Sequence, residues 1–156
     1  MYNIDLIAKY IIWLYQQAGE KITNLSLQKM CYYAQAWYLG NFHKQLFDED
    51  FQAWIYGPVC QQLYKTYKAF GKEGIDISIN QNEIGKLSDD DKQYLNELVS
   101  AYSKFSAIEL MLMSHAEQPW KDARDGCAAD QQCSTVISKK EIEKYYSSLI
   151  DGKSKI

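Results

Sequence analysis

The sequence has only two histidines, and this scarcity bears on catalysis because histidine is the usual general base. His43 lies in an expected turn beside Lys44, whereas His115 ends an apolar stretch that is expected to be helical. The helix dipole stabilises a cation at a helix C-terminus, so we expect His115 to act as a helix cap. An enzyme or metal site that uses His115 with nearby acids or cysteines is the less favoured alternative.

Motifs for phosphate binding and hydrolysis are also missing. The eight glycines are scattered, and none forms a G-x-G-x-x-G motif or a P-loop. Neither G-x-S-x-G nor H-E-x-x-H occurs. The sequence therefore predicts a protein that is not an enzyme and that uses no cofactor.

The four cysteines form no recognisable metal or redox motif. Cys31 and Cys60 lie on the apolar faces of expected helices, where a free cysteine packs as a small hydrophobe. Five residues separate Cys127 from Cys133, which matches neither a zinc knuckle nor a redox pair. Adding His115 gives no common zinc pattern, so no metal site is expected. A disulfide between Cys127 and Cys133 is compatible with the spacing.

The sequence also lacks a signal peptide and long apolar runs. Asp5 stands where a signal peptide would have a basic start, and the apolar stretch after it is amphipathic. No run reaches the roughly 18 apolar residues that a membrane-spanning helix needs. We therefore expect a cytoplasmic protein without membrane contact, whose thiols are reduced.

The chain has fewer basic than acidic residues, 17 against 20, which gives a formal net charge of −3 at pH 7. This argues against non-specific nucleic-acid binding, which needs a basic surface to displace counterions. Lys65, Lys68 and Lys72 cluster at the end of one expected helix, where the helix dipole explains them. Aromatic residues, by contrast, are abundant, with 13 Tyr, 4 Trp and 5 Phe. Such rings either fill gaps between helices or form protein interfaces.

The 156 residues fit a single domain, which we place at 1–150, with a polar tail at 151–156. Apolar residues at helical spacing predict about six helices, and capping residues mark their starts. The expected ranges are 5–18, 24–39 and 59–70, followed by helices that begin at Ser88, Ser106 and Ser138, with a further turn at 119–124. The predicted fold is mainly α, a compact bundle around a buried second helix that is apolar nearly all round.

Lys29 interrupts this second helix one turn after its start. If it is buried it needs an acidic partner, because an unpaired buried ammonium is costly. Alternatively, the long side chain extends along the helix surface to reach water. The sequence leaves both interpretations open.

A small antiparallel hairpin or sheet is expected at about 42–55. Residues 42–47 form a short extended piece, and Phe51–Ile55 has the alternation of a strand. Gly57 and Pro58 are expected to stop this strand, because proline cannot donate to a sheet, and to open a helix at Val59. Residues 75–79 alternate isoleucine with polar residues, so they are a candidate second edge.

Several short motifs, in their order and spacing, resemble the Panacea (SocA-like) antitoxin domain found in bacteria and their phages. They span about 2–147, and the most specific is Ala53-Trp-Ile-Tyr-Gly-Pro-Val59. The others are Ile22-Thr-Asn-Leu-Ser-Leu-Gln-Lys29, Met30-Cys-Tyr-Tyr-Ala-Gln35, Ser114-His115, Pro119-Trp120, Ala123-Arg124 and Ile142-Glu-Lys-Tyr-Tyr146. Within them, the resemblance assigns to the structural family motif Lys29, Tyr33, Trp54, Gly57, Pro58, His115, Pro119 and Trp120.

The resemblance implies a non-enzymatic domain that neutralises a cognate toxin, usually encoded by an adjacent gene. Neutralisation is expected to occur by direct binding. The alternative is a proteolysis adaptor that delivers the toxin to an ATP-dependent protease. We expect Trp54, Tyr56 and Trp120 to contact the partner. The aromatic content and the acidic net charge agree with such a role, since they suit an interface with a basic toxin.

Overall fold

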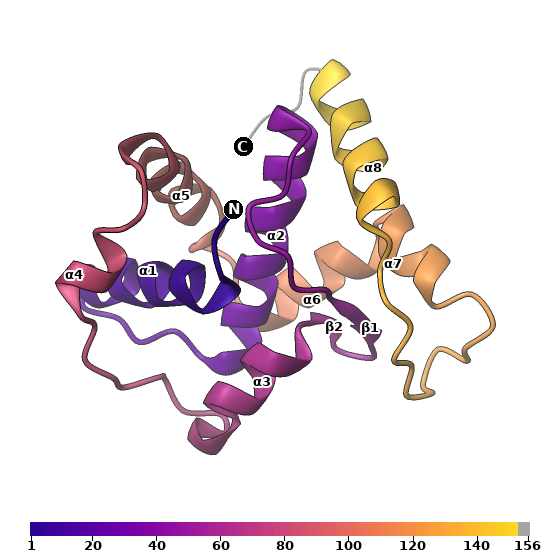
Figure 1. Ribbon diagram of the computed structural model, residues 1–156. Coiled ribbons are helices and arrows are strands. Elements are labelled where there is room, and N and C mark those ends of the chain that lie inside the picture. The colour runs from indigo at the N-terminus through magenta and orange to yellow at the C-terminus, as the bar shows by residue number, and fades with distance from the viewer. Residues whose placement is uncertain (153–156) are drawn as a thin grey trace.

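The second helix forms the centre of the fold. In the computed structural model, which describes residues 1–152, α2 (Asn24–Phe42) stands in the middle with other helices around it (Figure 1). Every residue of α2 from Leu27 to Gly40 is buried. This helix contacts α1, α3, α5, α6 and α8, so it joins the whole core. The predicted mainly α bundle around a buried second helix is confirmed; the predicted tail lies outside the described residues from 153 on.

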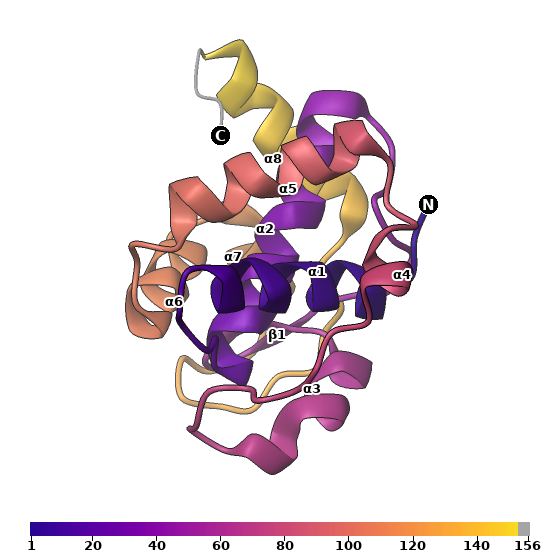
Figure 2. The same ribbon diagram turned by 90° about the vertical axis from the view of Figure 1, so that its left-hand side faces the viewer.

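Polar side chains cap the starts of the long helices, as their sequences predict. Thr23 accepts a hydrogen bond from the Ser26 amide at the start of α2. Asn3, Ser88, Ser106 and Ser138 do the same for α1 (Ile4–Gln17), α5 (Asp89–Tyr102), α6 (Ala107–His115) and α8 (Lys139–Asp151). These bonds satisfy amides that have no partner within the helix. Figure 2 shows α1 lying across α2, with α5 on one side of it and α3 on the other.

Three shorter helices complete the bundle. α3 (Gln61–Tyr67) continues into a single 3-10 turn, η1 (Lys68–Phe70). α7 (Gln118–Ala123) carries Pro119 in its first turn, as predicted. α4 (Gln81–Ile84) is a short helix that the sequence analysis does not include. The Asn80 side chain accepts from two backbone amides of its first turn and so stabilises it.

α2 runs three residues further than the sequence predicts. The helix is expected to end at residue 39, but Gly40 lies inside it, and α2 ends at Phe42 before His43, which has a left-handed φ of 55°. A Cβ at Gly40 would stand 2.7 Å from the Cβ of Tyr146 on α8. Gly40 is therefore required for close packing of two helices, and the predicted extended piece at 42–47 begins later.

The hairpin is formed by different residues from those predicted. β1 (Gln52–Trp54) pairs antiparallel with β2 (Gly57–Val59) around a two-residue turn, in the register Gln52↔Val59, Ala53↔Pro58, Trp54↔Gly57. The expectation that Gly57 and Pro58 end a strand and open a helix is wrong. Ala53 directs its N–H to the Thr135 carbonyl and its own carbonyl to Arg124, so the pair needs no N–H from Pro58.

The predicted second edge at 75–79 is also wrong. Ile75, Ile77 and Ile79 point inward in alternation, but the segment has no strand partner beyond one bridge between Thr23 and Gly74. The Gln16 side chain on α1 donates to the Ile77 carbonyl, so a helix takes the place of a neighbouring strand. Instead, residue 136 extends the hairpin on its other side through an antiparallel bridge to Gln52.

Candidate functional site

Residues of the family motif gather around β2. The Lys29 ammonium on α2 donates a hydrogen bond to the Pro58 carbonyl over 3.2 Å. Gly57 lies so close to α2 and α6 that a Cβ there would stand 2.6 Å from Lys29 Cε and 2.9 Å from Ser114 Oγ. Ser114 is fully buried and donates to the Met111 carbonyl. The strand is therefore held between two helices by residues that are far apart in the sequence.

Lys29 is a buried amino group without an acidic partner among the described residues. Its side chain is fully buried, and among residues 1–152 no carboxylate lies within ion-pair distance of it. Burial lowers the pKa of Lys29 to about 7. Both interpretations from the sequence are wrong, because the side chain neither reaches water nor pairs with an acid. A backbone carbonyl is its partner instead.

His115 and Trp120 form a stacked pair between α6 and α7. Their ring centroids are 4.0 Å apart with an interplanar angle of 20°. Trp120 Nε1 also donates to the Trp54 carbonyl over 3.2 Å. Burial lowers the pKa of His115, an effect that a backbone hydrogen bond at Ile55 partly offsets. His115 lies in the last turn of α6, where the sequence places it, and its role as a positively charged helix cap stays a prediction.

Arg124 fastens the loop at 125–135 to the hairpin. Its Nη1 donates to the Ala53 carbonyl over 2.8 Å, and its Nη2 donates to the carbonyls of Ala128 and Gln131. The guanidinium group has several donors in a fixed plane, so one side chain can hold three carbonyls. As a result, Gln132 in this loop lies beside the hairpin.

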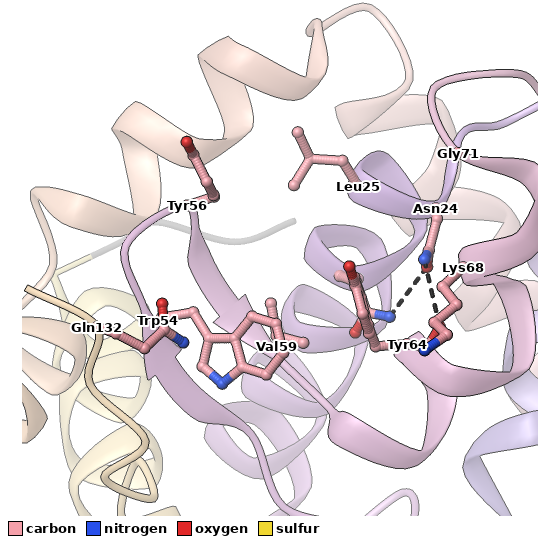
Figure 3. A pocket seen from close by; sticks show the side chains of 10 residues that line it. Asn24, Leu25, Trp54, Tyr56, Val59, Tyr64, Lys68, Gly71 and Gln132 are labelled. Atoms are coloured by element: carbon pink, nitrogen blue, oxygen red, sulfur yellow. Dashed lines mark hydrogen bonds between the residues drawn. The ribbon is translucent and has the colours of Figure 1, made fainter.

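A pocket of about 340 Å³ opens beside the hairpin, between α3 and the start of α2 (Figure 3). Trp54 and Tyr56 lie on its hairpin side, and Tyr64 and Lys68 lie on its α3 side. The rings of Trp54 and Tyr64 contact each other, with centroids 5.2 Å apart and an interplanar angle of 60°. The full lining is Asn24, Leu25, Gln28, Trp54, Tyr56, Val59, Tyr64, Lys68, Gly71 and Gln132.

The amide side chains in this pocket bond to one another and to the backbone. Gln28 Oε1 accepts from the Cys60 amide over 2.9 Å, and Gln28 Nε2 donates to Asn24 Oδ1 over 3.1 Å. Asn24 Nδ2 in turn donates to the Tyr64 carbonyl over 3.5 Å. Because these groups are already paired, the floor of the pocket offers a ligand mostly apolar contact.

Two of the three predicted contact residues line this pocket. Tyr56 is 62% exposed at the turn of the hairpin, and Trp54 is half-buried. Trp120 is half-buried against His115 and is not part of the pocket lining. The structure thus brings Trp54 and Tyr56 together at the pocket, whereas Trp120 bonds to the Trp54 carbonyl and lies outside the lining. Contact of any of the three with a partner stays a prediction.

The sequence did not single out the other walls of the pocket. Leu25 and Tyr64 lie in the first turns of α2 and α3, and the helical spacing assigns neither of them a role. The helix dipole accounts for Lys68 in the sequence, and the structure places it at the pocket. Its position at the helix end was visible; its proximity to the hairpin depends on tertiary packing.

A second exposed apolar surface lies on α6. Ile108 and Leu112 are 63% and 57% exposed. They are four residues apart, so they share one face of the helix. α6 also contacts β2. Large exposed apolar side chains that cluster on a surface mark interaction sites more often than chance placement does.

Within residues 1–152, no three His, Cys, Asp or Glu side chains are placed to hold a metal ion. Cys127 and Cys133 are free thiols. Over the same residues, no helix combines the length and apolar character needed to cross a membrane.

The chain is thus a helical bundle in which a short hairpin packs between α2 and α6, with an aromatic pocket beside the hairpin. The chain belongs to the Antitoxin SocA-like, Panacea domain family, which matches residues 27–121. This stretch contains α2 from Leu27 on, the hairpin, α6 and the stacked His115 and Trp120, and it is shorter than the 2–147 over which the motifs are recognised.

A named relative supports this membership. Antitoxin SocA of Caulobacter vibrioides (strain NA1000 / CB15N) is 29% identical over 115 residues, which cover 67% of this chain and 61% of the relative. The chain thus matches less than two thirds of the relative's length. No solved structure matches this chain.

Proposed function

We propose that this protein is an antitoxin that neutralises a cognate toxin by binding it directly, with no catalytic step of its own. The observation that carries the proposal is the exposed aromatic pocket beside the hairpin, in a chain of the SocA-like family. Aromatic side chains with a polar end are enriched at protein interfaces because they bury large areas at little entropic cost. Trp54 and Tyr56 are the contact residues that we propose.

Co-expression with the product of the adjacent gene tests this function. We expect the neighbour alone to stop growth, the pair to grow, and the two proteins to purify together. If the adjacent gene product does not stop growth and no partner co-purifies with this chain, the proposal is wrong.

A matched pair of variants tests the surface. Tyr56→Ala is expected to weaken toxin binding at least tenfold, because a well-packed interface aromatic contributes roughly 2 kcal/mol or more. Phe42→Ala is the control, since Phe42 is also exposed but ends α2 away from the hairpin. If both variants are folded by circular dichroism and bind the toxin equally well, Tyr56 does not contribute to toxin binding. Contact by Trp120, protease delivery and a cytoplasmic location stay predictions.

A further inference from the structure

We propose that the pocket at Trp54 and Tyr64 holds an apolar side chain of the toxin, and that a neighbouring carboxylate on the same toxin segment pairs with Lys68. This inference rests on the proposed function and names the chemistry that its binding site recognises. The occupant is an acidic and apolar segment of a protein, although the chain as a whole carries a net charge of −3.

The walls of the pocket select for an apolar group. Leu25, Val59 and the rings of Trp54 and Tyr64 surround it. At about 340 Å³ it lies at the lower end of the size range of ligand pockets, roughly 300–1,000 Å³. It therefore suits one or two side chains rather than a whole helix. The paired amides of Asn24 and Gln28 leave the floor with few open hydrogen-bonding groups.

The edge of the pocket selects for negative charge. Lys68 is the one Lys, Arg, Asp or Glu among the lining residues. It is exposed, and within residues 1–152 no carboxylate lies in ion-pair distance of it. Lys65 and Lys72 lie nearby in the chain and are likewise exposed, whereas Glu73 does not line the pocket. Lys68 is therefore the charged group that the pocket lining itself presents.

Single-stranded nucleic acid is the other macromolecule that aromatic rings and lysines attract. It binds along a positively charged groove that follows several phosphates, with bases stacked on open ring faces. Here one lysine lines the pocket, and the rings of Trp54 and Tyr64 meet each other at 60°. The arrangement favours a protein segment.

A charge-reversal pair tests the proposal with the purified product of the adjacent gene as the binding partner. Lys68→Glu is expected to weaken binding at least tenfold at 50 mM salt, and the loss should shrink at 500 mM salt as the ion pair is screened. Lys65→Glu, on α3 just before η1 and outside the pocket lining, is expected to weaken binding less than twofold. Equal effects of the two substitutions would overturn the inference.

This experiment separates the inference from the proposed function. If the wild-type chain neither binds nor neutralises the adjacent product, the proposed function fails. If it does both, and Lys68→Glu and Leu25→Asp bind as tightly as the wild type, only the pocket inference fails. Circular dichroism confirms that each variant is folded.

Photocrosslinking identifies the bound segment. With p-benzoylphenylalanine in place of Gln132, which is exposed and lines the pocket, we expect a crosslinked toxin peptide that has Asp or Glu within two residues of an apolar side chain. A basic peptide without acids would overturn the proposal. So would a crosslink to a second copy of this chain, or competition for the toxin site by a single-stranded oligothymidylate.

Discussion

At the scale of single residues, two ionisable side chains lie where desolvation opposes their charge, Lys29 fully buried and Glu117 half-buried. Lys29 has a pKa lowered to about 7, and Glu117, at the start of α7, has a pKa raised to about 7. Burial is the main cause in both cases, and for Glu117 it acts against a hydrogen bond that Tyr146 donates over 2.6 Å. The two groups give stability opposite pH dependences, which can be measured separately.

Lys29→Met should flatten the pH dependence of stability between about pH 7 and 10. The unfolded chain binds more protons than the folded chain over this window, since the pKa falls from 10.5 to about 7 on folding. Stability in the wild type therefore rises with pH there, by an amount on the order of 3–5 kcal/mol. Urea unfolding at pH 7 and pH 9.5 measures the difference. The exposed Lys44→Met is the control, and an equal slope in both variants would contradict the assignment.

Glu117→Gln should stabilise the protein above pH 7 and have little effect near pH 5. The pKa of Glu117 rises from 4.5 to about 7 on folding, so stability is fully present below pH 4.5 and is lost as pH rises through 7. Glutamine keeps an oxygen that can accept from Tyr146 without the buried charge. We expect a gain of about 2–3 kcal/mol at pH 8, relative to pH 5, in urea unfolding. The exposed Glu141→Gln supplies the comparison; a Glu117→Gln variant no more stable at pH 8 than at pH 5 speaks against a buried carboxylate.

At the scale of single elements, the hairpin shows where sequence patterns stop being informative. The alternation at 51–55 correctly predicts a strand, but Pro58 reads as a helix start because its missing N–H is costly in most ladders. It is tolerated in β2 because its partner Ala53 donates its N–H to the Thr135 carbonyl and accepts from Arg124 with its own carbonyl, so neither group needs Pro58. Those partners lie about 70–80 residues away in the chain, and no local pattern contains them.

Gly57→Ala should destabilise the hairpin more than a comparable change elsewhere. Gly57 has a φ of +99°, and a Cβ there would also meet Lys29 and Ser114. Gly19, with a φ of +78°, has nothing within 4 Å of its Cβ position. Gly19→Ala therefore carries only backbone strain, of about 1–2 kcal/mol. Gly57→Ala should cost about 1–3 kcal/mol more from overpacking.

Thermal unfolding of both glycine variants measures this difference. Similar Tm values for Gly57→Ala and Gly19→Ala would show that α2 and α6 leave room for a Cβ at Gly57 in solution. A larger drop in Tm for Gly57→Ala, together with weaker toxin binding, would show that the packing of Gly57 against α2 and α6 also shapes the pocket. Trp54, which lines the pocket, is paired directly with Gly57.

At the scale of the whole molecule, the sequence predicts the class of fold well and the binding surface only in part. Helical periodicity and caps locate most of the bundle, because they are local properties. The pocket draws on α2, the hairpin, α3 and the loop at 125–135, which only tertiary packing brings together. Hence Trp54 and Tyr56 are found from the family motif and their residue type, whereas Leu25, Tyr64 and Lys68 are not.

Toxin binding should stabilise the entire domain, because the pocket joins segments from both halves of the chain. A ligand that binds only the folded state at about 100 times its Kd adds about 2.7 kcal/mol. For a domain of this size, each kcal/mol raises the Tm by roughly 2–4 °C, so we expect an increase of roughly 5–11 °C.

Calorimetry with and without the adjacent gene product tests this linkage. Trp54→Ala should show a much smaller increase at the same toxin concentration, even if its own Tm is lower, because the relevant quantity is the shift that the toxin causes. Phe42→Ala should keep the full shift. An absent shift for the wild type at saturating toxin would contradict direct binding to the folded domain. An undiminished shift for Trp54→Ala would show that the toxin binds another surface. Substitution of Ile108 and Leu112 on the exposed face of α6 would then be the next test.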